Sequence, residues 1–210
     1  MNWTDNVVMR ALGRLCDFIL LNILWVVCSI PLFTIGASTT ALYTVMLKIV
    51  RNEEGYIVKG FLNAFRENFK KSTIIWLILA AVGIVIGIDS RVAAGMSSTM
   101  RTVFQSVFII FGVVWLCVVI YVFPLTARYE NTVRNTFKNA LLLSVAKLPF
   151  TLLMLVITAG PVLLTLLNTM TLMAGLGLWI IVGVSLVAWL NSFLLRRVFE
   201  IFHSKEEQGK

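Results

Sequence analysis

Charged residues are scarce in this chain of 210 residues, and their scarcity sets the class of protein. Asp, Glu, Lys and Arg make up 13% of the sequence, whereas they make up about a quarter of an ordinary soluble domain. Hydrophobic residues reach 59%, and they occur in long, repeated runs. These features exclude a soluble globular domain and indicate an integral membrane protein.

The residues that carry most enzyme chemistry are also few. The one histidine is His203 in the charged tail, so no Ser or Cys nucleophile has a histidine base. The three cysteines lie inside apolar runs without the spacing of a metal site or a disulfide framework. The sequence has no phosphate-binding loop of the G-x-x-x-x-G-K-[ST] type. We therefore expect a protein that is not an enzyme and has no catalytic residues, no metal and no cofactor.

The net charge of +8 would suit nucleic acid in a soluble protein. Here the basic residues lie between the apolar runs, where membrane topology explains them. We therefore expect membrane lipids, and no nucleic acid, among the partners.

The apolar runs predict an all-α fold, a polytopic membrane helical bundle with six transmembrane helices in one domain, 1–210. One crossing needs about 20 apolar residues. The first run lacks a small-residue cleavage site, so it is interpreted as a retained span rather than a signal peptide. Its only charge, Asp17, either pairs with Arg14 on the same helix face, which we expect, or is a buried functional acid. The predicted spans are 15–33, 35–50, 73–88, 102–127, 148–167 and 172–195, followed by a tail at 196–210.

The distribution of Lys and Arg predicts the topology. With six crossings, sixteen of the eighteen basic residues fall on the side that holds both termini, and Arg91 and Arg101 alone fall on the other. The positive-inside rule then places the N- and C-termini in the cytoplasm, together with segments 51–72 and 128–147.

The first of these segments carries a phenylalanine ridge. Phe61, Phe65 and Phe69 recur every four residues among charged side chains, which predicts an amphipathic cytoplasmic helix. The ridge lies on lipid headgroups or binds a partner protein, and the sequence leaves both open.

Pro31 is expected to end or kink the first span, and a corner rich in hydroxyl groups follows it. These side chains either cap and pack helices, which is the commoner role, or form an external, substrate-side corner that could line a pore. Glycines in the last span permit close helix contact. The corner comprises Thr34, Gly36, Ser38, Thr39 and Thr40, and the glycines are Gly175, Gly177 and Gly183.

Four blocks of the sequence resemble the YesL family of small bacterial membrane proteins: IPLFTIGASTTALY from Ile30, EEGY from Glu53, FRENFKKSTIIW from Phe65 and ARYENT from Ala127. The resemblance covers nearly the whole chain. It implies a multi-pass protein of the bacterial cytoplasmic membrane. Because that family typically accompanies systems that import and degrade oligosaccharides, including ABC importers, it also implies a role in carbohydrate uptake.

A second resemblance comes from spacing. ABC importer permeases dock their ATPase through a cytoplasmic loop that begins with Glu-Ala-Ala and closes with Leu-Pro nineteen residues after the Glu. Glu130, Leu148 and Pro149 have this spacing, but Asn131 and Thr132 replace the alanines and Thr136 replaces a glycine. The segment is either a degenerate coupling loop or an ordinary helical connection, and the departures favour the latter.

These features favour a non-catalytic accessory or scaffold subunit of a bacterial carbohydrate-uptake complex. We expect it to pack against the permease subunits of an ABC-type oligosaccharide importer and to stabilise or regulate them. The alternative is an autonomous passive channel or permease for a small polar solute.

Overall fold

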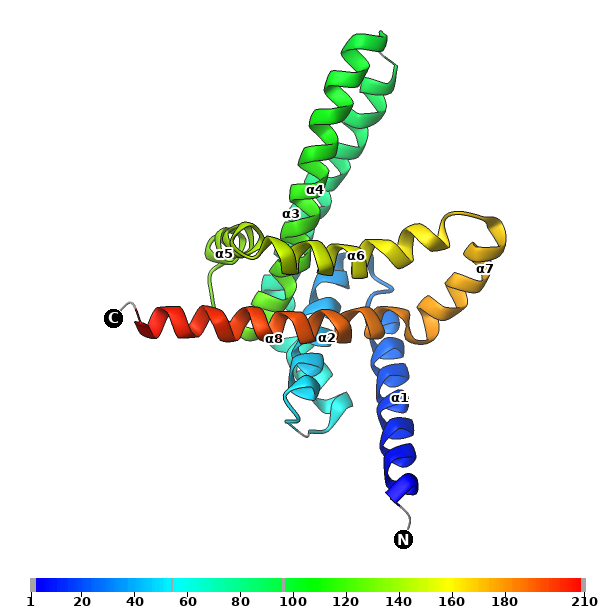
Figure 1. The fold of residues 1–210 in the computed structure, drawn as a ribbon, viewed down its shortest axis with the longest axis vertical. Coiled ribbons are helices and arrows are strands. Elements are labelled where there is room, and N and C mark those ends of the chain that lie inside the picture. The colour runs from blue at the N-terminus through cyan, green and yellow to red at the C-terminus, as the bar shows by residue number, and fades with distance from the viewer. Residues whose placement is uncertain (1–2, 54, 96, 209–210) are drawn as a thin grey trace.

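The computed structural model describes residues 3–53, 55–95 and 97–208, and within them it contains helices and no strand. This confirms the all-α prediction. A 3₁₀ turn at Leu32–Thr34 precedes α2, and a π-helical turn at Trp179–Gly183 joins α7 to α8. In chain order the α-helices (Figure 1) are α1 (Trp3–Cys28), α2 (Ile35–Val50), α3 (Ile57–Ala94), α4 (Ser98–Arg128), α5 (Val133–Ala146), α6 (Leu148–Thr165), α7 (Thr169–Leu178) and α8 (Val184–Gln208).

Five helical stretches of the described chain are long and apolar enough to cross a membrane. Each overlaps one of the last five predicted spans, which supports a multi-pass membrane protein. The first predicted span, 15–33, corresponds to the second half of α1 and is not among the five, so the count of six crossings stays a prediction. The five are Leu32–Val50, Ile57–Ala93, Thr99–Arg128, Leu148–Thr165 and Thr169–Phe199.

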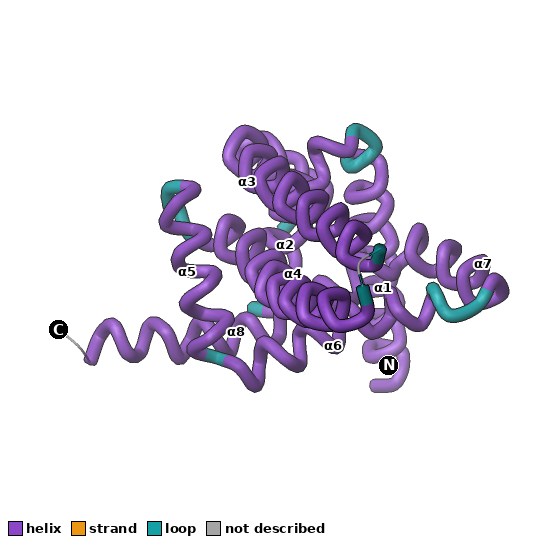
Figure 2. Tube along the Cα trace, turned by 90° about the horizontal axis from the view of Figure 1, so that it is seen from above, coloured by secondary structure: helices purple, strands orange, loops and turns teal. Residues whose placement is uncertain are grey.

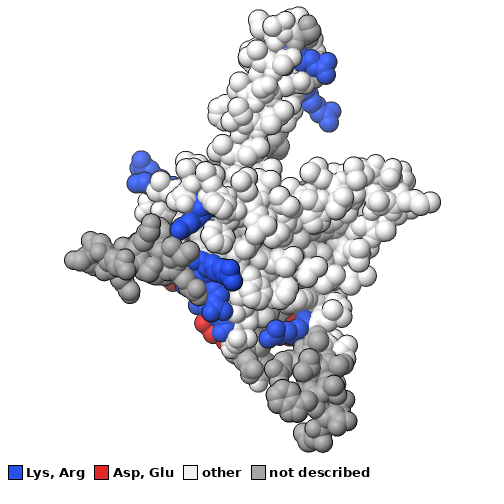
Figure 3. Space-filling model, in the orientation of Figure 1, with Lys and Arg blue, Asp and Glu red and all other residues white. Residues whose placement is uncertain are grey.

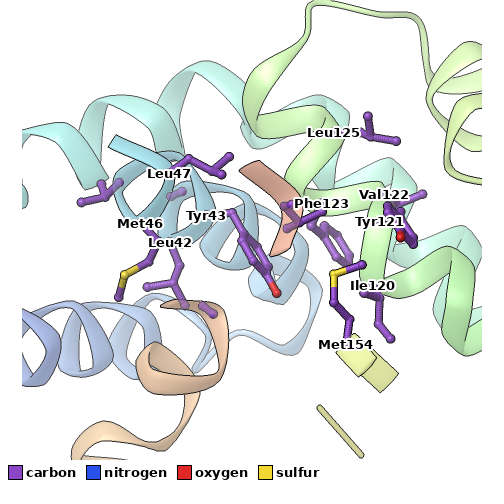
Figure 4. Packing of buried hydrophobic residues seen from close by; sticks show 14 of the residues in the cluster. Leu42, Tyr43, Met46, Leu47, Ile120, Tyr121, Val122, Phe123, Leu125 and Met154 are labelled. Atoms are coloured by element: carbon purple, nitrogen blue, oxygen red, sulfur yellow. The ribbon is translucent and has the colours of Figure 1, made fainter. Parts of the chain in front are cut away.

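Helix α2 is the centre of the molecule. Eleven of its sixteen residues are buried, and its neighbours are α1, α3, α4 and α8. Figure 4 shows Tyr43 and Met46 of α2 in one cluster with Tyr121 and Phe123 of α4 and Met154 of α6. The buried residues include the polar Ser38 and Thr40, which suit a position enclosed by other helices better than one against lipid.

Helix α3 runs through most of the predicted cytoplasmic segment 51–72 and the whole of the predicted span 73–88, and the placement of the two parts relative to the membrane stays a prediction. One continuous helix of 38 residues joins them, because neither Gly nor Pro interrupts the chain between Gly60 and Gly83. Its length is about 57 Å, roughly twice the hydrocarbon thickness of a bilayer. The change from charged to apolar residues therefore marks a change of surroundings along one helix.

The charged half of α3 lies against α2. Trp76 Nε1 donates to Leu32 O at 2.8 Å, and near the other end of α2 the side chain of Val45 lies beside Gly60. The apolar half of α3 therefore projects beyond α2 with α4, as a hairpin (Figure 1). Helices α6 and α8 run across this hairpin (Figures 1 and 2), so the bundle is crossed rather than parallel.

Helices α2 and α3 pack closely against each other at Gly36. A Cβ atom there would lie 2.5 Å from both Ser72 O and Trp76 Cβ, and part of that contact is backbone that cannot rotate away. We expect Gly36→Ala to lower the free energy of unfolding by about 1–3 kcal/mol through overpacking. Thermal unfolding of the purified protein in detergent measures this.

Gly87→Ala is the matched control, because a Cβ at Gly87 has open space among the described residues. Its melting temperature should stay equal to that of the wild type or rise, since Ala favours a helix over Gly by about 1 kcal/mol. Equal melting temperatures for the two variants would show that the α2–α3 contact is not tight.

Candidate functional site

A cavity of about 740 Å³ lies where α1, the end of α2, the connecting loop and the start of α3 meet. We call it the basal cavity. Its volume is in the range of small-molecule sites, about 300–1,000 Å³. It is lined by Gly13, Arg14, Asp17, Val45, Lys48, Ile49, Asn52, Glu53, Gly55, Tyr56, Ile57, Lys59, Gly60 and Asn63.

The loop of the basal cavity is shaped by the C-terminal cap of α2. Glu53 N donates to Lys48 O at 3.0 Å and Asn52 N donates to Ile49 O at 3.0 Å, which is the Schellman arrangement. Asn52 has φ 56°, a left-handed conformation that Asn tolerates better than most residues. The cap ends α2 and leads the chain around the cavity into α3.

The cavity carries more cations than acids. Arg14, Lys48 and Lys59 come from three different helices, and the acids are Asp17 and Glu53. Glu53 Oε1 forms an ion pair with Arg51 Nη1 at 3.3 Å. Among the side chains that the structure describes, this is the only ion pair, so the expected Arg14–Asp17 pair does not form. Three cations therefore face the cavity without an acidic partner in the described part of the chain.

The three side chains of the phenylalanine ridge differ in how far they are buried. Phe61 is fully buried in the core, Phe65 is half-buried, and Phe69 is 37% exposed. Successive rings contact one another, with centroids 6.4 Å and 5.4 Å apart. Only the end of the ridge at Phe69 is open to lipid or to a partner.

The hydroxyl-rich corner lies at the start of α2, where its side chains bond to helices. Thr40 Oγ1 lies 2.8 Å from Ser72 Oγ of α3, and Thr39 Oγ1 accepts from Trp25 Nε1 of α1 at 3.1 Å. Thr34 Oγ1 donates to the carbonyls of Cys28 and Pro31, at 2.5 and 2.6 Å. Ser38 is fully buried, and Gly36 makes the close contact with α3 described above.

The segment from Glu130 to Pro149 contains α5 and the first turn of α6. Glu130 is exposed and precedes α5, which begins at Val133 with Thr132 as its cap. Leu148 and Pro149 form the first turn of α6, because Pro is well tolerated there. A single residue, Lys147, separates α5 from α6. Both Leu148 and Pro149 are exposed.

The three glycines of the last predicted span have different surroundings. Gly175 packs tightly against the Thr165 side chain, across the turn between α6 and α7. Gly183 lies against the Trp179 ring of its own π turn, and Gly177 has no neighbour within 4 Å among the described residues.

Asn22, a buried asparagine that the sequence patterns did not single out, holds α1 to the π turn. Asn22 Nδ2 donates to Trp179 O at 2.9 Å and to Ile180 O at 2.6 Å, and Asn22 Oδ1 accepts from Ser185 N at 3.0 Å. A π turn frees carbonyls from the regular helical pattern, and here the amide takes up two of them. The signal was an uncharged polar residue inside a predicted span.

Asn191 has a similar place. Its Nδ2 donates to Thr158 Oγ1 at 2.9 Å and lies 3.4 Å from the Tyr43 hydroxyl, so it joins α8 to α6 and α2.

The fold and the apolar surface define a polytopic α-helical membrane protein. Its sequence is 30% identical over 155 residues to the uncharacterized protein YteU of Bacillus subtilis (strain 168). The aligned region covers 70% of this chain and 69% of YteU. It is 24% identical to the uncharacterized protein YesL of the same organism over 97% of this chain and 96% of YesL. Residues 18–90 match a family described as protein of unknown function, DUF624.

The chain therefore belongs to the YesL-like family. No solved structure matches it.

We expect Asn22→Leu to destabilise the junction of α1 and the π turn. The substitution removes three hydrogen bonds and leaves two carbonyls and one N–H without partners, at a cost of about 1–3 kcal/mol. The expected result is a lower melting temperature and faster amide hydrogen exchange across residues 179–185.

Thr44→Val serves as the control, because the Thr44 hydroxyl bonds only the Thr40 carbonyl of its own helix, at 2.9 Å. That variant should resemble the wild type. Unchanged exchange at residues 179–185 in Asn22→Leu would mean that the π turn does not depend on Asn22.

Proposed function

We propose that this protein is a non-catalytic accessory subunit of a bacterial carbohydrate-uptake complex in the cytoplasmic membrane. In this proposal it packs against the permease subunits of an ABC-type oligosaccharide importer and stabilises or regulates them. The carbohydrate part rests on the family resemblance, and the non-catalytic part rests on the shortage of histidine, cysteine and acidic residues in the sequence.

The α3–α4 hairpin has an uncovered apolar surface. Ile84, Val85 and Ile88 of α3 and Ile109 and Ile110 of α4 each expose more than half of their surface. Lipid chains cover such a surface as well as a protein does, so exposure alone does not select a partner.

The observation that carries the subunit proposal is a groove on the same hairpin, which favours a helix of another protein. It has a volume of about 660 Å³, and its lining residues include Trp76, Trp115, Gly83, Gly87 and Gly112. A Cβ at Gly87 or Gly112 would meet nothing within 4 Å among the described residues. Small residues on an open helix face let another helix approach closely, which suits packing against a permease.

The placement of the hydroxyl corner favours a subunit over a channel. A pore through the corner would require its hydroxyls to face an open path. Instead, Thr34 and Thr40 are buried and bond to carbonyls or to Ser72, and Thr39 bonds to Trp25. These contacts support the helix-packing role.

The test is recovery of partners from the native membrane. The tagged wild type, purified in mild detergent, should bring down the permease subunits and ATPase of an oligosaccharide importer in near-stoichiometric amounts, identified by mass spectrometry. The double variant Gly87→Leu, Gly112→Leu fills the groove from two positions at which a Cβ meets no described atom within 4 Å, so recovery should fall severalfold.

Ile110→Leu is the matched control, because Ile110 is exposed on the same hairpin but does not line the groove. Recovery of the wild type without partner proteins, together with sugar flux through the reconstituted protein, would indicate a channel instead of a subunit. Equal recovery of partners with all variants would show that the partner does not bind at the groove.

A further inference from the structure

The basal cavity has a charge pattern that the proposed function does not use. Arg14, Lys48 and Lys59 reach it from α1, α2 and α3. The ion pair with Arg51 compensates Glu53, which leaves Asp17 as the one unpaired acid in the described lining. The described lining of the cavity thus keeps a net positive charge and suits an anionic group.

A second hollow extends the positive surface along α3. It encloses about 590 Å³ and shares Tyr56, Lys59 and Asn63 with the basal cavity, and it adds Arg66. Lys59 therefore lines both hollows. Tyr56, which also lines both, is 87% exposed. Figure 3 shows Lys and Arg surface with acidic surface beside it below the middle of the molecule, whereas the α6–α7 arm is uncharged.

An apolar stripe on α1 begins at the same cavity. Leu20 and Val27 stand seven and fourteen residues after Gly13, so they lie near the helix face that carries this cavity residue. Leu20 is 40% exposed and Val27 is 55% exposed. A ligand with a charged head and an apolar chain would meet a matching surface at both ends.

The cavity also lies where a membrane surface is expected. It is built around the loop that joins the candidate spans Leu32–Val50 and Ile57–Ala93, and it includes the residues at which the apolar part of α1 begins. Basic residues at such boundaries attract anionic lipids, each contributing about 1 kcal/mol.

We propose that the basal cavity binds the phosphate headgroup of an anionic membrane phospholipid. Arg14, Lys48 and Lys59 hold the phosphate oxygens, and the acyl chains run along the Leu20 and Val27 face of α1. Asp17 accepts a hydrogen bond from a headgroup hydroxyl, such as that of glycerol in phosphatidylglycerol. The site is independent of the importer and does not require the proposed function to be correct.

The test uses the full-length protein and native mass spectrometry, titrated with dioleoyl phosphatidylglycerol and, in parallel, with dioleoyl phosphatidylcholine. The wild type should retain phosphatidylglycerol preferentially. The triple variant Arg14→Gln, Lys48→Gln, Lys59→Gln should bind phosphatidylglycerol roughly 100-fold more weakly. Lys48→Arg preserves the charge and should bind like the wild type.

The control triple variant Arg134→Gln, Lys138→Gln, Lys147→Gln changes the net charge equally on and beside α5, away from the cavity. Its affinity should stay within a few-fold of the wild type, and all variants should elute as the wild type does in gel filtration. Equal affinity of the two triple variants would overturn the site, because net charge alone would then explain binding.

Glycerol 3-phosphate distinguishes the source of the phosphate. If it leaves phosphatidylglycerol bound at millimolar concentration, the lipid headgroup is supported. Displacement of the lipid by glycerol 3-phosphate, with loss of that competition in the cavity variant, would overturn the lipid and assign the cavity to a soluble phosphate ester.

Discussion

The close crossing of α2 and α3 at Gly36 is the contact on which the rest of the arrangement depends. Without a side chain at this position, α2 approaches α3 closely enough for Thr40 to reach Ser72. The crossing fixes which half of α3 lies against α2. It therefore also fixes how far the α3–α4 hairpin projects and where the loop that borders the basal cavity lies.

Buried polar side chains hold the helices that cross this pair. Asn22 joins α1 to the π turn, Asn191 joins α8 to α6, and Tyr121 of α4 bonds Thr151 of α6 at 3.0 Å. A lipid environment offers no hydrogen-bond partner, so such groups must find one within the protein. Because each bond joins helices that are far apart in sequence, these side chains specify the crossed arrangement.

Sequence patterns predicted the helices well and their surroundings less well. Apolar run lengths located five candidate spans, and Pro31 lies just after α1, which ends at Cys28. The charged residues before position 73 predicted a cytoplasmic segment and the apolar residues after it a span, but charge specifies which surroundings a helix prefers and not where it ends. The continuity of α3 follows from the lack of a helix breaker, a local signal that the charge pattern obscured.

The site residues were harder to predict because their roles depend on partners distant in sequence. The sequence left Gly36 with two alternatives, helix packing or an external corner, and its packing contact requires knowledge that Ser72 and Trp76 lie opposite. Phe61 and Phe69 look equivalent in the sequence, yet the first is buried and the second is exposed. The basal cavity combines residues of three helices, none of which forms a motif alone.

The cations at the basal cavity have two explanations, membrane topology and a bound anion, and the two make different demands on the side chains. The positive-inside rule depends on how many Lys and Arg residues lie near the ends of the spans, and it does not depend on where their side chains point. Arg134 and Lys138 satisfy it from α5, exposed and outside the cavity. Arg14, Lys48 and Lys59 satisfy it too, but they also converge on one hollow without an acidic partner in the described lining.

Membrane topology leaves that convergence unexplained, because dispersed cations would satisfy the positive-inside rule equally well at a lower cost in mutual repulsion. A bound anion removes the repulsion, so the geometry of these three residues, rather than their number, is what favours a ligand.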